Sequence, residues 1–175
     1  MYGARDIAES FRTVRKNTIQ IAEDIPADQY GFRAAEGVKS VGELLAHIAV
    51  SPGWQIHVHG QRISSIDFSF FAGRAPQVSA EEKALQTKDQ ILEALKTRGE
   101  EFALMAAGMT PEALADVVSF APPMQPSQKT RFEMLLGVKE HEMHHRGQLM
   151  LIERMLGIVP HLTRRRQATV AGART

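Results

Sequence analysis

Four segments of the chain repeat apolar residues at the three- and four-residue spacing of an amphipathic helix. The first predicted helix covers about residues 4–23 and ends before Pro26. Its apolar face consists of Ile7, Phe11, Val14 and Ile21. The residues that we expect on its solvent side are Arg12, Arg15, Lys16 and Glu23.

The second helix begins at Ser40 and continues to about Gly60. Ser40 and Glu43 have the spacing of a capping box, in which each side chain accepts a hydrogen bond from an exposed amide at the helix start. Its inner face consists of Leu44, His47, Ile48, Trp54 and Val58. Pro52 has no backbone N–H, which leaves the carbonyl of Ile48 without its helical partner. We therefore predict one helix with a kink after His47, not two separate helices.

Two more helices begin at patterns of the same capping type. The third starts near Thr87 and ends near Gly108, and the fourth starts at Thr130 and ends at Gly157, before Pro160. The apolar face of the third is Ile91, Leu95, Phe102 and Met105. That of the fourth is Met134, Leu135, Val138, Leu149, Ile152 and Leu156. Almost no segment has the pattern of a strand, so the predicted fold class is all-α.

Two long connections, residues 61–86 and 109–129, separate these helices. The first can span more than the roughly 30 Å length of a 20-residue helix, so the third helix can run parallel to the second after a crossover. We expect residues 1–175 to form a single domain. The tail from about residue 162, which contains Arg164, Arg165, Arg166 and Arg174, is expected to be solvated or frayed, and a phosphate-binding patch is the alternative.

Charge and composition exclude several classes of function. The chain of 175 residues has 21 Lys and Arg against 20 Asp and Glu, so it has little overall attraction for nucleic acid or an anionic membrane. It contains no cysteine, which excludes disulfides, cysteine-ligated zinc and a catalytic thiolate of its own. No apolar run reaches the roughly 18–20 residues of a membrane span, and the first ten residues lack the pattern of a signal peptide. We therefore expect a cytoplasmic protein without nucleic-acid or membrane partners.

Three of the seven histidines are placed to meet on inward faces. His141 and His145 are four residues apart, about 40° around a helix, on the face that also carries Val138 and Leu149. With His47 of the second helix they predict a three-histidine site with open positions, the arrangement of catalytic metals. Imidazole suits zinc, nickel, copper or iron. Hydrogen-bonded core histidines without metal are the alternative.

The remaining polar and aromatic residues near this site have two interpretations each. Gln148, one turn after His145, and Glu43, one turn before His47, are candidates to hydrogen-bond a ligand imidazole, although the cap already accounts for Glu43. Trp54 either walls the site or packs in the core. Phe68, Phe70 and Phe71 either cover an apolar substrate or cover the bundle end or a partner subunit.

Other residues are expected to lie outside the site. Helical geometry turns His144 about 100° from His145, toward the flank of the bundle. The residues expected at the surface are His57, His59, Glu142 and Arg146. His161 follows the end of the fourth helix and is expected to have no role.

Two segments, SVGELLAHIA (Ser40–Ala49) and HEMHHRGQLMLIERMLGIVP (His141–Pro160), resemble the DinB-like family of four-helix-bundle proteins, which are regarded as metalloenzymes. The segment YGFRAAEGVKS before the second helix is also similar to that family. The resemblance implies an up-down-down-up bundle, often a homodimer. It also implies a divalent metal, commonly nickel or zinc, with iron as a further option, on His47, His141 and His145.

The resemblance also bears on function. Some related proteins use the metal to activate a low-molecular-weight thiol, for transfer of its sulfur or for isomerising a small acid. It therefore implies a metal-dependent enzyme acting on a small molecule, of the S-transferase type, and assigns no catalytic residue. The absence of cysteine fits a thiol that arrives as a cosubstrate. A metal-dependent hydrolase and a non-catalytic dimeric metal-binding module are the alternatives.

Overall fold

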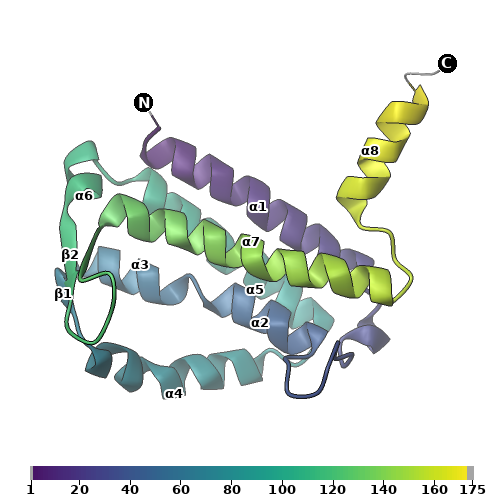
Figure 1. Cartoon of the computed structure of the whole chain (residues 1–175), viewed down its shortest axis with the longest axis horizontal. Helices are drawn as coiled ribbons and strands as arrows, with labels where there is room; N and C mark the ends of the chain where they lie inside the picture. The colour runs from purple at the N-terminus through teal and green to yellow at the C-terminus, as the bar shows by residue number, and fades with distance from the viewer. Residues whose placement is uncertain (1, 173–175) are drawn as a thin grey trace.

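The structure is a computed structural model that describes residues 2–172, and it is mostly helical with a small sheet. The helices are α1 (Ala4–Asp24), α2 (Val41–Val50), α3 (Gly53–Gly60), α4 (Phe68–Ala84), α5 (Lys88–Ala107), α6 (Pro111–Ala115), α7 (Arg131–Met155) and α8 (His161–Gly172), with a 3₁₀ turn at Ala27–Gln29. The strands are β1 (Ser65–Ile66), β2 (Val117–Phe120) and β3 (Gln128–Thr130). Helix α1 packs against both α5 and α7, and α2 and α3, in succession, pack against the same two helices (Figure 1).

Local sequence signals position the ends of these helices. The capping boxes predicted at Ser40, Thr87 and Thr130 are all formed, and each hydroxyl accepts the backbone N–H three residues later. Helix α7 ends where Gly157 adopts a positive φ of 76°, a conformation that glycine allows without strain. The backbone N–H after it, that of Ile158, donates to the Glu153 carbonyl at 2.7 Å and closes the helix.

The predicted apolar faces form the core. Every residue predicted on the apolar face of the first helix is buried, and so are Ile91, Leu95 and Phe102 of α5 and Met134, Leu135, Val138, Leu149 and Ile152 of α7. Phe11 and Phe102 stack with their ring centroids 4.6 Å apart. Burial of these side chains holds α1, α5 and α7 together.

Arg15 and Glu142 contradict the prediction that both lie on solvent faces. Arg15 is 4% exposed and Glu142 is 2% exposed. The Nε and Nη2 of Arg15 donate to the Glu142 carboxylate at 2.8–3.0 Å, and Nη1 donates to the Leu95 carbonyl. Gly99 provides the space, since a Cβ there would lie 2.9 Å from Arg15 Cγ. Two opposite charges can be buried together because each satisfies the other.

The prediction of one kinked helix through Pro52 is wrong. The segment is divided at Ser51 and Pro52 into two helices, α2 and α3. Pro52 and Ser51 keep helical dihedral angles, so α3 continues roughly the course of α2. Pro52 has no backbone N–H to donate to the Ile48 carbonyl. This carbonyl instead accepts a hydrogen bond from Arg15 Nη2 at 3.2 Å. The buried arginine thus replaces the hydrogen bond that the proline removes.

The two long connections contain regular structure that the sequence patterns do not predict. Residues 61–86 hold β1 and α4, and residues 109–129 hold α6, β2 and most of β3. Strand β1 pairs parallel to β2, with Ser65 opposite Ser119, and β2 pairs antiparallel to β3, with Val117 opposite Thr130. Strands of two to four residues are too short to show an alternating pattern, and the β1–β2 pair joins segments far apart in sequence.

The small sheet and the start of α4 cover one end of the bundle. The buried residues of this cluster are Ile66 of β1, Val118 of β2, Val58 of α3 and Met134 of α7, with Trp54, Phe70 and Phe71 packed against them. The Trp54 and Phe71 ring centroids lie 5.6 Å apart, so Trp54 and these two phenylalanines take part in core packing at the bundle end. Phe68 is 68% exposed and remains outside this cluster.

Helix α8 extends away from the bundle, with its first turn against the end of α1 (Figure 1). The tail is therefore helical rather than frayed as far as Gly172, although its residues from Arg164 onward are exposed. Arg174 lies outside the described residues. None of the described helices is both long and apolar enough to cross a membrane.

Candidate metal centre

The structure brings together the three histidines that the sequence analysis singled out. His47 comes from α2, and His141 and His145 come from successive turns of α7. The Nε2 atom of His141 lies 3.2 Å from Nε2 of His47 and 3.1 Å from Nε2 of His145. All three side chains are half-buried, so the cluster is neither sealed in the core nor spread on the surface.

Hydrogen bonds at the outer nitrogens orient two of these rings. His47 Nδ1 lies 2.7 Å from Oε1 of Glu82 in α4, and His145 Nδ1 lies 2.8 Å from Oε1 of Gln148. A carboxylate and an amide oxygen can only accept, so each Nδ1 carries the hydrogen. The Nε2 atom of each of these two rings is the one that faces His141.

The protonation states suit metal ligands. Burial lowers the pKa of His141 to about 4, and the neighbouring histidines add to this shift. Burial also lowers the pKa of His145, against the opposing effect of its hydrogen bond to Gln148. Both imidazoles are consequently neutral at pH 7, which is the form that binds a metal ion.

The spacing of the nitrogen atoms fits one ion. Two ligands at about 2.0–2.1 Å from a tetrahedral zinc ion lie about 3.3 Å from each other. The two Nε2–Nε2 distances of 3.1 and 3.2 Å are close to that value, and one ligand atom from each of the three histidines lies within 4.8 Å of the others. The cluster could therefore hold a metal ion, and three nitrogen donors do not specify which.

Gln148 was a candidate to hydrogen-bond a ligand imidazole, and in the structure its Oε1 accepts from Nδ1 of His145. Its amide nitrogen also approaches Nε2 of His144 at 3.3 Å, and His144 is exposed and lies outside the cluster, as its helical position predicts. Glu43 does not contact His47. Instead it caps Ser40 and pairs with Arg33 at 2.8 Å, which lowers the pKa of the Glu43 carboxyl to about 2.

Glu82 is the residue of the site that the sequence analysis missed. It lies 35 residues after His47, in the long connection of residues 61–86, where no helix was predicted. Its second oxygen accepts from Nζ of Lys39 at 3.3 Å. A helical pattern in this segment would have pointed to Glu82. The segment has no such pattern, because it contains Pro76 and none of its residues is buried in the structure.

The other four histidines lie outside the cluster, and two of them correct the predictions. His59, expected at the surface, is buried, and its Nδ1 accepts from Nη1 of Arg131 at 3.1 Å. Burial lowers the pKa of His59 to about 4. His161, expected to have no role, is also buried and its Nε2 donates to Oδ1 of Asn17 at 3.1 Å. His57 and Arg146 are half-buried.

Comparisons with known proteins agree with this fold. The chain is 26% identical over 157 residues to the uncharacterized protein YjoA of Bacillus subtilis, a match that covers 90% of this chain and 93% of YjoA. The crystal structure of that DinB-like protein superposes with a TM-score of 0.65 at 25% identity, covering 87% of this chain and 92% of the other. The family model of the DinB superfamily matches residues 10–149. The chain therefore belongs to the DinB superfamily.

Proposed function

We propose that this protein holds one divalent metal ion, nickel or zinc, on Nε2 of His47, His141 and His145, and uses it to act on a small molecule. The convergence of three imidazole nitrogens, two of them oriented by Glu82 and Gln148, is the observation that carries the proposal. Three neutral ligands leave the charge of the ion uncompensated and leave positions free, which is typical of catalytic sites.

A low-molecular-weight thiol is the proposed cosubstrate. A divalent ion with open positions lowers the pKa of a bound thiol, so the thiolate forms near neutral pH. The chain has no cysteine, so the sulfur nucleophile has to come from outside. Lys39 pairs with Glu82 at 3.3 Å and contributes to the lowered pKa of His145, after burial and the neighbouring histidines, so it places a cation beside the cluster.

The roles of this chain's own residues follow from their contacts. Glu82 and Gln148 hold two imidazoles in the tautomer that presents Nε2. The buried Arg15–Glu142 pair sits next to His141 along α7 and ties this turn to α1. These contacts fix the three donors before any ion binds, which lowers the free-energy cost of assembling the site.

We also infer that the long helices form the up-down-down-up bundle of the family and that the protein is a homodimer. The directions of α1, α2–α3, α5 and α7 in Figure 1 support the first inference. Met143, Leu151 and Met155 support the second, because they form an exposed apolar row along α7. Size-exclusion chromatography with light scattering tests the homodimer. We expect the unmodified protein to have twice the mass of one chain and Leu151→Glu to have the mass of a single chain.

Thiol binding at the metal is tested by absorption spectroscopy of the nickel-loaded protein titrated with glutathione. A thiolate on nickel gives a sulfur-to-metal charge-transfer band, which we expect for the unmodified protein and for His144→Ala but not for His145→Ala. A nickel-loaded protein whose spectrum does not change with thiol would refute the thiol role. Ester hydrolysis by the same metal-loaded protein without thiol would favour the hydrolase.

A further inference from the structure

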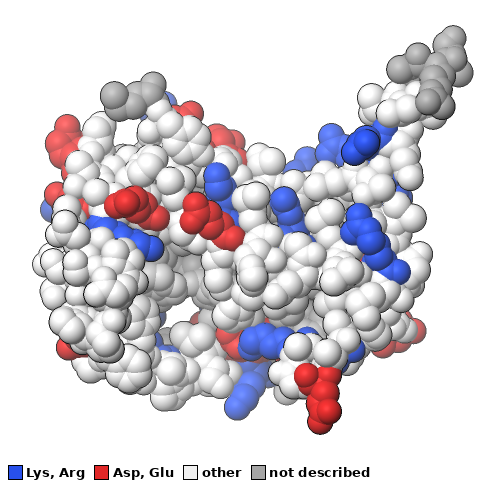
Figure 2. Space-filling model, in the orientation of Figure 1, with Lys and Arg blue, Asp and Glu red and all other residues white. Residues whose placement is uncertain are grey.

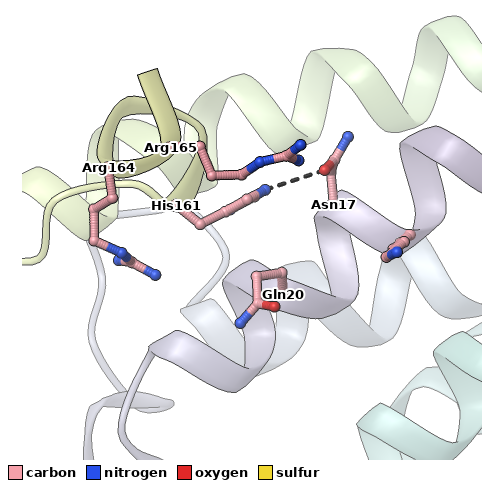
Figure 3. Close-up of a pocket in the computed structure, with 6 residues that line it drawn as sticks. Asn17, Gln20, His161, Arg164 and Arg165 are labelled. Atoms are coloured by element: carbon pink, nitrogen blue, oxygen red, sulfur yellow. Dashed lines mark hydrogen bonds between the residues drawn. The ribbon is translucent and has the colours of Figure 1, made fainter. Parts of the chain in front are cut away.

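A second candidate site lies at the other side of α7, where the first turns of α8 meet the end of α1. A cavity of about 280 Å³, open to solvent, lies there (Figure 3). Its lining residues are Lys16, Asn17, Gln20, His161, Arg164 and Arg165. Ligand pockets typically measure roughly 300–1,000 Å³, so the cavity suits a small molecule and is too small for a folded partner.

The lining of this cavity is cationic. Three of the six residues, Lys16, Arg164 and Arg165, carry a positive charge, and none carries a negative one. Arg164 donates to Asp24 at 2.5 Å, outside the lining, whereas Lys16 and Arg165 form no ion pair with the residues that the structure describes. Two positive charges are therefore available to a ligand, and an anion is the chemistry that they favour.

His161 gives the cavity a fixed and buried polar wall. The side chain is 6% exposed, and its Nε2–H donates to Oδ1 of Asn17, as Figure 3 shows. Burial lowers the pKa of His161, so the ring is neutral and its Nδ1 is an acceptor. This Nδ1 is buried and has no hydrogen-bond partner among the described residues. His161 therefore shapes the wall of the cavity, and the charged side chains of the lining are the groups available to a ligand.

The wider electrostatic field has the same sign. Between Met143 and Gly172 the chain has five arginines and a single acidic residue, Glu153, although the net charge of the whole chain is only +1. Figure 2 shows several Lys and Arg side chains near the base of α8, while Asp and Glu side chains lie at the upper left and at the lower right of the view. A cavity inside a positive region concentrates anions from solution.

We propose that the cavity between α1 and α8 binds a small phosphate-bearing molecule. Arg165 and Lys16 would hold the phosphate oxygens, since a guanidinium and an ammonium both form charge-assisted hydrogen bonds with them. This site is independent of the histidine cluster and shares no residue with it.

Isothermal titration calorimetry with inorganic pyrophosphate tests this proposal on the full chain. Each charge-assisted hydrogen bond contributes enough that we expect Arg165→Gln and Lys16→Gln each to weaken the Kd about tenfold or more. Arg5→Gln is the matched control, because Arg5 is exposed near the opposite end of α1 and the change removes the same charge. Its Kd should stay within about twofold of that of the unmodified protein.

Three outcomes would overturn the proposal. The first is an absence of binding at millimolar pyrophosphate. The second is an equal loss for Arg5→Gln and Arg165→Gln, which would show diffuse attraction in place of a site. The third concerns His145→Ala. We expect this variant to bind pyrophosphate as tightly as the unmodified protein. A loss of binding in that variant would place the anion on the histidine cluster.

Discussion

Replacing Arg15 by Met tests whether the buried ion pair holds the bundle together at the kink. The substitution keeps an unbranched side chain but leaves Glu142, at 2% exposure, without its cation. It also removes the donors to the Leu95 and Ile48 carbonyls. Breaking a buried pair on one side costs roughly 3–5 kcal/mol, because an uncompensated charge remains. Typical stabilities are about 5–15 kcal/mol, so we expect a folded but much weakened protein.

Further substitutions separate the cost of the unpaired Glu142 charge from the cost of the unsatisfied Ile48 carbonyl. Arg15→Met combined with Glu142→Leu removes both charges, so the loss should fall to the roughly 1–3 kcal/mol of an unsatisfied Ile48 carbonyl. Adding Pro52→Ala supplies the missing backbone N–H at a position with helical dihedral angles, and it should recover part of the remainder.

The free energy of unfolding is measured by urea titration with circular dichroism at 222 nm, in chelator, so that metal binding at the neighbouring His141 does not contribute. The order of stability that we expect is the unmodified protein, then the triple variant, the double variant and Arg15→Met. If the single and double variants are equally unstable, the Glu142 charge is not what makes the loss large, and the reasoning is wrong.

Three further predictions concern Glu153, Gly99 and Glu82. Glu153 is fully buried with both oxygens unpartnered among the described residues, and burial raises its pKa from 4.5 to about 7. The folded state then binds the proton more tightly than the unfolded state, so the free energy of unfolding should fall by about 3 kcal/mol as the pH rises from 4.5 to 7. In urea titrations Glu153→Gln should flatten this slope. Identical slopes for the variant and the unmodified protein would contradict the raised pKa of Glu153. Gly99→Ala places a Cβ 2.9 Å from Arg15 Cγ and should lower stability by about 1–3 kcal/mol, whereas Gly137→Ala in α7, with nothing within 4 Å, should be neutral or stabilising. Glu82→Ala should weaken zinc affinity about 10–100-fold in competition with a chromophoric chelator, and Glu81→Ala, whose carboxylate pairs with Arg98, should not; equal effects would refute a positioning role for Glu82.

The helices that form the core could be predicted because their signals are local. Ser40, Thr87 and Thr130 mark helix starts by a hydroxyl and a side chain three residues later, and each of these caps is present. Apolar spacing then orients each helix toward the core. Arg15 and Glu142 escaped prediction because apolar spacing assigns charged residues to solvent, and their pairing joins positions 127 residues apart.

The histidine cluster was partly predictable for the same reason. His141 and His145 share a helical face by spacing alone, and His47 lies on an inward face. Glu82 was not predictable, because α4 has no buried residue and hence no apolar period to reveal it. The short strands β1–β3 were missed because each has only two to four residues, too few to show an alternating pattern, and because β1 pairs with a strand about 50 residues later.

Elemental analysis of protein purified without a metal-affinity tag tests the central claim most directly. The measurement compares the metal content of the unmodified protein, His145→Ala and His144→Ala, each after exposure to zinc or nickel and removal of the excess. We predict one ion per chain in the unmodified protein and in His144→Ala, and most of it lost in His145→Ala. No metal in any sample, or loss in His144→Ala but not in His145→Ala, would contradict the proposed centre.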